Sequence, residues 1–340
     1  RDPEMSRGLG DVYKRQGIPM EEMDAYIQDI LDLIDYANGD PKKSQWAKLR
    51  AESGHPKPFN LKYIGIGNED LITDVFEERF TLIYDAIKKH HPEITVIGTV
   101  GPFYEGTDYE EGWNLADRLN VPMVDEHYYN TPGWFIYNQN YYDKYDRSKS
   151  KVYLGEYAAH LPGRPNNIET ALAEALYLTA VERNGDMVLM TSYAPLLAKE
   201  GYTQWNPDLI YFNNKEVKPS VGYYTQLLYG QNSGDRYLPA ESKIDNNRND
   251  VRSRIASSIV RDSPTGDLII KLVNLLPAAV NSQLNLPADA KDKQAKVTVL
   301  SGDPDDQNAK PVEKALEASD KLSYTLPPYS FSVILSLIHI

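Results

Sequence analysis

Two short apolar segments of this sequence each pass through a glycine and end at a glutamate. Residues 63–70 read YIGIGNED, and residues 151–157 read KVYLGEY. Each is typical of a buried strand that stops where polar side chains begin, with Glu69 in the first and Glu156 in the second. Two carboxylates from separate strands suit glycoside cleavage, because a protonated one donates to the leaving oxygen while an ionised one attacks the anomeric carbon. The two glutamates are therefore our candidate catalytic pair.

Two neighbouring polar residues are suited to assist this pair. Asn68 precedes Glu69 and can bond a sugar hydroxyl, a contact that strengthens in the transition state. Tyr128 follows the apolar segment 121–126, and its hydroxyl can hold the carboxylate of the nucleophile. We expect both residues at the edge of the sheet where the glutamates lie.

The elements that position these residues alternate between short apolar runs and segments of helical period. In parallel α/β architectures, functional side chains lie at the carboxyl ends of the strands, which is where both glutamates fall. The alternation implies parallel strands with helical crossovers, in a doubly wound sheet or in part of a (β/α)₈ barrel. The predicted strands are 61–66, 94–98, 121–126, 151–155 and 187–192, and the predicted helices are about 20–38, 73–90, 168–183 and 220–230, with a polar loop after the first helix.

The composition changes after about residue 235, where short alternating segments are separated by turns rich in Asn, Gly and Pro. This pattern predicts a β-sandwich with strands at 255–260, 268–273, 296–300 and 329–335. Both ends lack a hydrophobic period and resemble translated adapter sequence. We therefore predict a non-native leader at 1–17, a catalytic domain at 18–232, the β-sandwich at 233–335 and a non-native tail at 336–340, in a fragment of a longer gene product.

Composition excludes several classes of function. A formal net charge of −13 without clusters of Lys and Arg argues against a nucleic-acid partner. The chain has no cysteine and no apolar run near the ~18 residues of a membrane span. Neither a Gly-x-Gly-x-x-Gly nor a Walker A loop is present, so we expect no nucleotide cofactor. Ser192 lacks the elbow motif of a serine hydrolase.

We expect no metal site either. The adjacent residues Asp125, Glu126 and His127 point to alternate faces of a strand, so they cannot all bind one ion. Asp125 and Glu126 are then structural acids, satisfied by a helix end or by a neighbouring tyrosine. The 25 Tyr and 4 Trp suit stacking on sugars, although core packing accounts for most of them.

Five motifs in order give the chain a specific resemblance to the α-L-arabinofuranosidases of glycoside hydrolase family 51, in particular the plant-like branch. They are YIGIGNED, VDEHYY, LGEYA, TSYAPL and WNPDLIYF, at residues 63–70, 124–129, 154–158, 191–196 and 205–212. The resemblance extends from about residue 18 to residue 335. It implies a (β/α)₈ TIM barrel of which strands 4 to 8 are present, followed by a C-terminal β-sandwich.

The resemblance also implies roles for individual residues. Glu69 is the general acid/base at the end of barrel strand 4, and Glu156 is the nucleophile at the end of strand 7. Asn68 binds the hydroxyl beside the reacting carbon, and Tyr128 on strand 6 contacts the nucleophile. The family retains configuration, so the carboxyl groups should lie ~5 to 5.5 Å apart. Further substrate-binding residues implied by the resemblance are Asn206, His127 and Trp134.

The implied reaction is removal of terminal α-L-arabinofuranosyl groups from arabinoxylan, arabinan or their oligosaccharides, without cofactor or metal and without a nucleic-acid or membrane partner. Such substrates suggest a periplasmic or extracellular protein, and the sequence gives no indication of oligomeric state. Two alternatives remain open. One is another retaining glycosidase of the same clan, such as an endo-glucanase with a long cleft. The other is a fragment that binds carbohydrate without turning it over.

Overall fold

The computed structural model describes residues 18–286, 295–316 and 321–336. The predicted leader at 1–17 and residues 337–340 of the predicted tail lie outside these ranges. Among the helices of the described ranges, none has the length and hydropathy that crossing a membrane requires. The chain divides into two compact units, unit 1 (Arg1–Tyr128 with Arg147–Leu154) and unit 2 (Tyr129–Asp146 with Gly155–Ile340). The predicted boundary at 232/233 falls inside unit 2.

Five strands form one sheet in chain order: β1 (Tyr63–Ile66), β2 (Thr95–Thr99), β3 (Met123–Asn130), β4 (Lys151–Ala159) and β5 (Val188–Tyr193). The pairs β1–β2 and β2–β3 are parallel. All five predicted strands are therefore confirmed, with differences of a few residues at their ends. The unit boundary crosses β3 and β4, so each of these strands contributes to both units.

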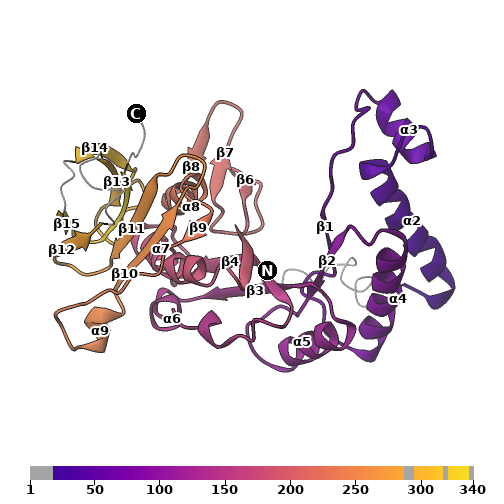
Figure 1. Cartoon of the computed structure of the whole chain (residues 1–340), viewed down its shortest axis with the longest axis horizontal. Coiled ribbons are helices and arrows are strands. Elements are labelled where there is room, and N and C mark those ends of the chain that lie inside the picture. The colour runs from indigo at the N-terminus through magenta and orange to yellow at the C-terminus, as the bar shows by residue number, and fades with distance from the viewer. Residues whose placement is uncertain (1–17, 287–294, 317–320, 337–340) are drawn as a thin grey trace. The chain divides into compact units, whose positions relative to one another are not determined.

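Unit 1 contains four described helices, labelled in Figure 1: α2 (Met20–Asn38), α3 (Gln45–Glu52), α4 (Asp74–His90) and α5 (Thr107–Leu119). Helix α4 shows how the sequence specifies such an element. The Thr73 side chain accepts a hydrogen bond from the backbone N–H of Phe76 and so caps the first turn. Acidic residues in the first turn and basic residues in the last turn complement the helix dipole. The predicted helix 73–90 is confirmed to within one residue.

Helix α3 lies in the segment that we expected to be a polar loop. Its Arg50 is fully buried, and the guanidinium donates hydrogen bonds to the backbone carbonyls of Tyr36, Gly39 and His55. One side chain thus connects the end of α2 with the segment that follows α3. The sequence prediction missed this helix because its stabilising contacts come from residues distant in the chain.

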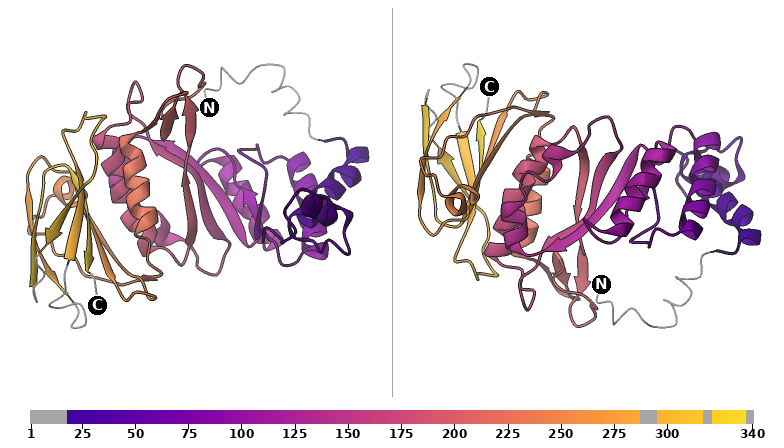
Figure 2. Two further views of the ribbon diagram at one scale, coloured as in Figure 1. Left: turned by 90° about the horizontal axis from the view of Figure 1, so that it is seen from above. Right: turned by 90° about the horizontal axis from the view of Figure 1, so that it is seen from below.

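Unit 2 is organised around helix α7 (Ile168–Arg183), which matches the predicted helix 168–183. Thirteen of its sixteen residues are buried. A capping box of Asn167 and Thr170 begins the helix. Helix α7 contacts α6 (Pro132–Tyr137) and α8 (Val221–Gln231). It also contacts strands β10 (Ile255–Arg261), β11 (Leu268–Asn274) and β16 (Ser330–Ser336), and Figure 2 shows α7 and α8 beside the sheet of these strands. This burial on every side explains why α7 has no polar face, with apolar residues all around its central turns.

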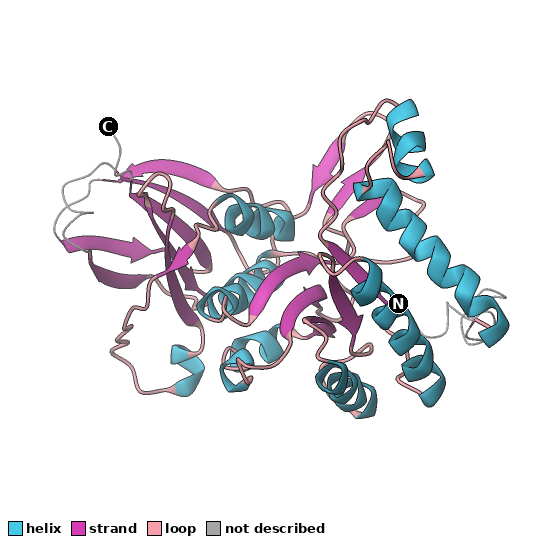
Figure 3. Ribbon diagram, turned by 45° about the vertical axis from the view of Figure 1, so that its right-hand side comes forward, coloured by secondary structure: helices cyan, strands magenta, loops and turns pink. Residues whose placement is uncertain are grey.

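The C-terminal part of unit 2 consists mainly of strands (Figure 3). The six-stranded sheet has the order β14-β13-β16-β11-β10-β9, and β12 pairs with β15 in a second sheet. Leu268 and Ile270 of β11 share a buried core with Leu322 and Leu326 of β15, so the two sheets enclose one core. The strands and the short helix of this part are β9 (Arg236–Tyr237), α9 (Asn249–Arg252), β10 (Ile255–Arg261), β11 (Leu268–Asn274), β12 (Val280–Asn285), β13 (Ala295–Ser301), β14 (Val312–Leu316), β15 (Lys321–Leu326) and β16 (Ser330–Ser336).

The four predicted C-terminal strands correspond to β10, β11, β13 and β16. Strands β9, β12, β14 and β15 were missed. No side chain of β12 or β14 is buried and their hydrophobic alternation is weak, and β9 has only two residues. A third, three-stranded sheet was also missed, since strands of three residues carry no readable period. It comprises β6 (Leu197–Lys199), β7 (Ile210–Phe212) and β8 (Val217–Pro219).

Candidate active site

The turn after β1 fixes the position of Glu69 in unit 1. Gly67 has φ of +85°, and a Cβ there would lie 2.5 Å from Cγ2 of Thr99, so only glycine fits. The backbone N–H of Asn68 donates to Oδ2 of Asp70 at 2.8 Å, which closes the turn. Glu69 itself has φ of +56°, a region that few non-glycine residues occupy. Such backbone strain occurs most often at functional sites, which supports the choice of Glu69.

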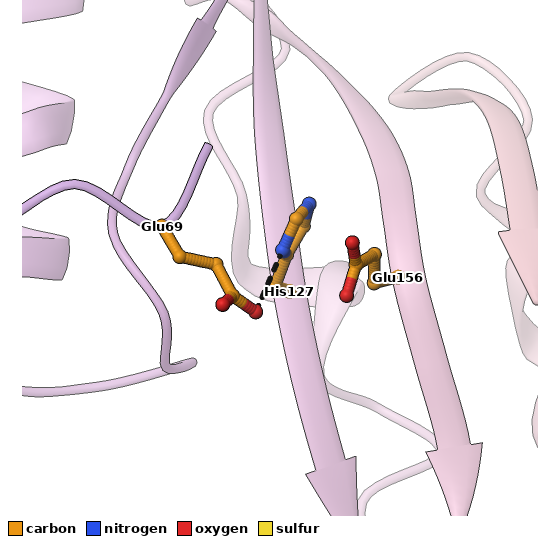
Figure 4. Close-up of side chains that lie close together, drawn as sticks. All are labelled: Glu69, His127 and Glu156. Atoms are coloured by element: carbon orange, nitrogen blue, oxygen red, sulfur yellow. Dashed lines mark hydrogen bonds and ion pairs between the residues drawn. The ribbon is translucent and has the colours of Figure 1, made fainter. Parts of the chain in front are cut away.

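Glu69 is the first member of a chain of three polar side chains, and Figure 4 shows its contact with the second member, His127. Its Oε1 lies 3.1 Å from Nδ1 of His127, and Nε2 of the same ring lies 3.1 Å from Oδ2 of Asp125. The His127 side chain is 3% exposed, whereas those of Glu69 and Asp125 are 19% and 17% exposed. A carboxylate thus lies beside each ring nitrogen, an arrangement that fixes the orientation of the imidazole.

The alternation of side chains along β3 explains why Asp125 and His127 meet. Residues two apart on a strand share a face, and the residue between them points to the other face. Accordingly, Glu126 is fully buried and accepts a hydrogen bond from Nε1 of Trp113 on α5 at 3.2 Å. This partner of Glu126 is a tryptophan, where we expected a helix end or a tyrosine. Asp125 is not satisfied by a helix end or a tyrosine in the way we expected, since its Oδ2 pairs with His127.

Glu156, drawn in Figure 4, extends from β4 in unit 2. Tyr129 donates its hydroxyl to Oε2 of Glu156 at 2.6 Å. We expected this contact from Tyr128, and the structure gives it to the adjacent residue instead. Tyr128 is 1% exposed, and its ring packs edge-on against Tyr104. The difference of one residue follows from the alternation of side chains on β3.

Two further rings pack on the ring of Tyr129, and an arginine covers one of them. His160 stacks on Tyr129 with ring centroids 5.2 Å apart and planes inclined by 15°. The Trp205 ring lies 5.6 Å from Tyr129 and 6.1 Å from His160. Arg164 covers Trp205, with its guanidinium carbon 4.4 Å from the ring centroid. We call Tyr129, His160, Trp205 and Arg164 the aromatic clamp.

The structure places the remaining predicted residues in different surroundings. Asn206 is exposed and directly follows Trp205, and its carbonyl accepts a hydrogen bond from Arg164 at 3.4 Å. Asn68 is exposed and precedes Glu69. Trp134 belongs to a second aromatic group with Tyr141 and Tyr177, where Tyr177 is on α7.

Burial shifts the pKa of two side chains that follow Glu156 in unit 2, His160 and Glu174. Burial, together with the charge of Arg164, lowers the pKa of His160 to about 4, so this ring is neutral at neutral pH. Glu174 on α7 is fully buried, and burial raises its pKa to about 8. Oε1 of Glu174 accepts a hydrogen bond from the backbone N–H of Ala159 at 2.9 Å. The end of β4 is thus attached to a carboxyl group that is mostly protonated at pH 7.

Sequence reasoning did not identify His160, Trp205 and Arg164 as parts of the site. Pro162 and Gly163 mark a turn, but no pattern indicates which ring Arg164 covers. Trp205 stood within a motif that drew attention to Asn206 instead. Contacts between segments some forty residues apart have no local signal.

A parallel sheet with carboxylates at its strand ends is the architecture of many glycoside hydrolases. Comparison with known families specifies the class. Residues 6–147 match the family described as "Alpha-L-arabinofuranosidase 1 domain", and residues 137–330 match "Alpha-L-arabinofuranosidase C-terminal domain". The chain belongs to the α-L-arabinofuranosidases of glycoside hydrolase family 51.

Individual relatives agree with this assignment. An extracellular exo-α-L-arabinofuranosidase of Streptomyces chartreusis is 48% identical over 217 residues, which is 64% of this chain and 26% of that protein. α-L-Arabinofuranosidase 1 of Arabidopsis thaliana is 32% identical over 328 residues, covering 90% of this chain and 45% of the relative. The chain therefore spans about half the length, or less, of these curated relatives.

Solved structures share the fold. An arabinose-bound α-L-arabinofuranosidase of family GH51 has a TM-score of 0.81 and 29% identity, covering 94% of this chain and 52% of its own. The α-L-arabinofuranosidase of Thermotoga maritima, solved as an arabinose complex, has a TM-score of 0.69 and 16% identity. The match covers 91% of this chain and 73% of that protein. The second likeness concerns the fold alone.

Proposed function

We propose that this chain carries the catalytic pair of a retaining, exo-acting α-L-arabinofuranosidase, with Glu156 as nucleophile and Glu69 as general acid/base. One observation carries the proposal. Glu69 follows the end of β1 by three residues and Glu156 lies in β4 three residues before its end; both strands belong to one sheet, and each glutamate contacts a side chain of β3. Family membership supports arabinofuranoside hydrolysis as the reaction of this pair.

In the first step, Glu69 in its protonated form donates its proton to the glycosidic oxygen as the bond to the anomeric carbon breaks. The ionised Glu156 attacks that carbon and forms a glycosyl ester. The hydroxyl of Tyr129 donates a hydrogen bond to Oε2 of Glu156, which stabilises the negative charge of the nucleophile.

In the second step, Glu69 is a carboxylate and takes a proton from water, whose oxygen attacks the anomeric carbon. The ester bond breaks, Glu156 regains its negative charge, and Glu69 is protonated again. His127 is in contact with Oε1 of Glu69 and keeps the carboxyl group oriented in both steps. Two inversions give net retention, which requires the two carboxyl groups ~5 to 5.5 Å apart.

For the fold, we propose that β1 to β5 are strands 4 to 8 of a (β/α)₈ barrel and that the C-terminal sheets form a β-sandwich. The likeness to solved α-L-arabinofuranosidases and the shared core of the two C-terminal sheets support this reading. Asn68 and Asn206, each beside a site residue in sequence, are proposed to bind substrate hydroxyls. His127 and Trp134 complete the proposed set of substrate-binding residues.

The proposed substrates are arabinoxylan, arabinan and their oligosaccharides, from which terminal α-L-arabinofuranosyl groups are removed. Two relatives support this choice, one named an exo-α-L-arabinofuranosidase and one solved with arabinose bound. The Streptomyces relative is named extracellular. We accordingly propose that this protein acts in the periplasm or outside the cell.

The test is turnover of 4-nitrophenyl α-L-arabinofuranoside and release of arabinose from arabinan, by the 340-residue chain and by the product of its full gene. We expect monomeric arabinose from at least the full product, with retained configuration by NMR at early times. Oligosaccharide products from an internal cut would favour an endo-acting glycosidase of the same clan. Binding of arabinan without any turnover by either protein would overturn the enzymatic proposal in favour of carbohydrate binding.

A further inference from the structure

In the aromatic clamp, two rings contact Tyr129, whose hydroxyl donates a hydrogen bond to Glu156. His160 covers a face of the Tyr129 ring with nearly parallel planes, and Trp205 contacts both of these rings. Arg164 covers Trp205 and also donates a hydrogen bond to the carbonyl of Asn206. All four side chains belong to unit 2, from the end of β3 to the segment before β7.

Ring stacking is the main contribution that His160 can make to this arrangement. Its Nε2 is buried and has no hydrogen-bond partner among the described residues. Burial and the nearby Arg164 lower the pKa of the ring to about 4, so it stacks as a neutral aromatic group. Its backbone N–H donates to the carbonyl of Asn130 at 2.7 Å, which fixes the main chain beside Tyr129. A phenyl ring of similar size could therefore replace the imidazole.

The turn that carries Arg164 has an uncommon backbone. Gly163 has φ of +76° and Arg164 has φ of +53°, and the N–H of Arg164 donates to the carbonyl of Leu161 at 2.9 Å. A non-glycine residue in the left-handed region is disfavoured, so surrounding contacts must maintain it. The contacts of Arg164 with Trp205 and with the Asn206 carbonyl account for its conformation.

Tyr129 needs such support because its bond to Glu156 depends on the position of a long side chain. The hydroxyl oxygen lies several bonds from the backbone, so small rotations of the ring move it out of the 2.6 Å contact. Packing on the ring restricts these rotations, and near-attack geometry is sensitive to displacements of about 1 Å.

We propose that His160 and Trp205 are positioning residues of the reaction, which hold Tyr129 on Oε2 of Glu156, and that Arg164 closes the clamp over Trp205. This inference rests on the proposed function. It predicts that the clamp acts on the reaction through Tyr129. The competing reading is ordinary core packing, since Tyr129 also packs against the buried group of Ala158, Tyr193 and Leu209.

A double-mutant cycle separates these readings, with turnover of 4-nitrophenyl α-L-arabinofuranoside by the full gene product as the readout. His160→Ala should lower kcat by about tenfold to a hundredfold, in the range of a lost hydrogen bond to a charged group, with little change in KM. His160→Phe should recover most of that loss, because it restores the stacked ring. In a Tyr129→Phe background, His160→Ala should cause little further loss.

Tyr137→Ala is the matched control. Tyr137 is also an aromatic residue of unit 2 that packs under an arginine, Arg254. It differs from His160 in being half-exposed on α6 and in lying outside the aromatic clamp. Its removal should leave kcat unchanged. Losses from His160→Ala and Tyr129→Phe that simply multiply would overturn the proposal, as would a His160→Phe variant no better than His160→Ala.

Crystal structures of the wild-type chain and of its His160→Ala and His160→Phe variants test the clamp independently of activity. In His160→Ala, the distance from the Tyr129 hydroxyl to Oε2 of Glu156 should exceed hydrogen-bonding range, and in His160→Phe it should stay near 2.6 Å. An intact bond in the His160→Ala variant would contradict the inference. If the wild-type protein has no glycosidase activity, the proposed function fails while these distances still decide whether the clamp holds Tyr129.

Discussion

The two units hold their glutamates by different means. In unit 1, Glu69 belongs to a chain of polar groups in which His127 links it to Asp125. In unit 2, Glu156 receives one short hydrogen bond from Tyr129, whose ring is packed by His160 and Trp205. The sequence gives both glutamates the same setting, an apolar run with a glycine before the acid. Their tertiary surroundings are unlike each other.

This difference matches what each carboxyl group has to do in the proposed reaction. A general acid/base changes its protonation state twice in a cycle, and contact with His127, itself beside Asp125, keeps such a carboxyl group oriented through both changes. A nucleophile has to stay ionised and correctly placed until it attacks, which a neutral donor on a rigid ring provides. The comparison therefore predicts that substitutions around Glu69 in unit 1 and around Glu156 in unit 2 affect turnover differently.

Alanine at each glutamate should show the largest contrast. Glu156→Ala should lower turnover by about 10⁴-fold or more on every substrate, because no ester can form. Glu69→Ala should cost about 10² to 10⁴-fold on arabinan, but much less on 4-nitrophenyl α-L-arabinofuranoside, whose leaving group needs little proton donation. Steady-state rates on both substrates measure these losses of turnover, and circular dichroism checks that each variant is folded.

Equal losses on the two substrates in Glu69→Ala would contradict its assignment as the acid. A Glu156→Ala variant that turns over either substrate at the wild-type rate would remove the nucleophile from the scheme.

Glu174→Gln tests the support behind the nucleophile strand. Burial raises the pKa of Glu174 to about 8 in the folded chain, above the ordinary 4.5 of the unfolded chain. Below pH ~4.5 the carboxyl group is therefore protonated in both the folded and the unfolded chain, and its contribution to stability is complete. Between these values the unfolded chain releases a proton that the folded chain keeps, so stability decreases as pH rises. Glutamine resembles the protonated acid, and above pH ~8 the variant should be more stable by on the order of 5 kcal/mol. Urea unfolding at pH 4, 6 and 8 measures the difference.

A difference between wild type and Glu174→Gln that stays constant from pH 4 to 8 would show that this carboxyl group does not titrate as burial implies.

Gly67→Ala tests the turn that holds Glu69. The added Cβ would meet Thr99 at 2.5 Å in a backbone conformation disfavoured for alanine, so we expect a loss of roughly 2–3 kcal/mol in the free energy of unfolding. Chemical denaturation measures this loss. Gly54→Ala is the matched control, since it has φ of +93° but no neighbour within 4 Å. Similar losses at both positions would show that backbone strain alone, without the contact to Thr99, is responsible.

Asp125→Asn should have the smallest effect of the series. The substitution keeps the size of the side chain but removes the charge beside Nε2 of His127, so we expect about a tenfold loss of turnover, as for one hydrogen bond to a charged group. The loss should be larger on arabinan than on the 4-nitrophenyl substrate, because Asp125 acts through the acid. An equal loss on both substrates would separate Asp125 from the function of Glu69.

The sequence by itself determined the regular elements of the sheet and the position of both glutamates along the chain. Strands β1 to β5 and helices α4 and α7 were predictable because a hydrophobic period, a cap and a terminal glycine are local properties. The same holds for β10, β11, β13 and β16. Helix α3 and the three-residue strands were not predictable, since their stabilising partners lie elsewhere in the chain.

Only the tertiary structure decided which side chains support each glutamate. The sequence indicated Tyr128, but the direction of the side chains on β3 gives the bond with Glu156 to Tyr129. It indicated structural acids at Asp125 and Glu126. In the structure Asp125 contacts His127, and Glu126 accepts a hydrogen bond from Trp113. A strand period specifies alternation, but packing determines which of the two faces meets the site. Stacking and hydrogen bonding between distant segments depend on that choice.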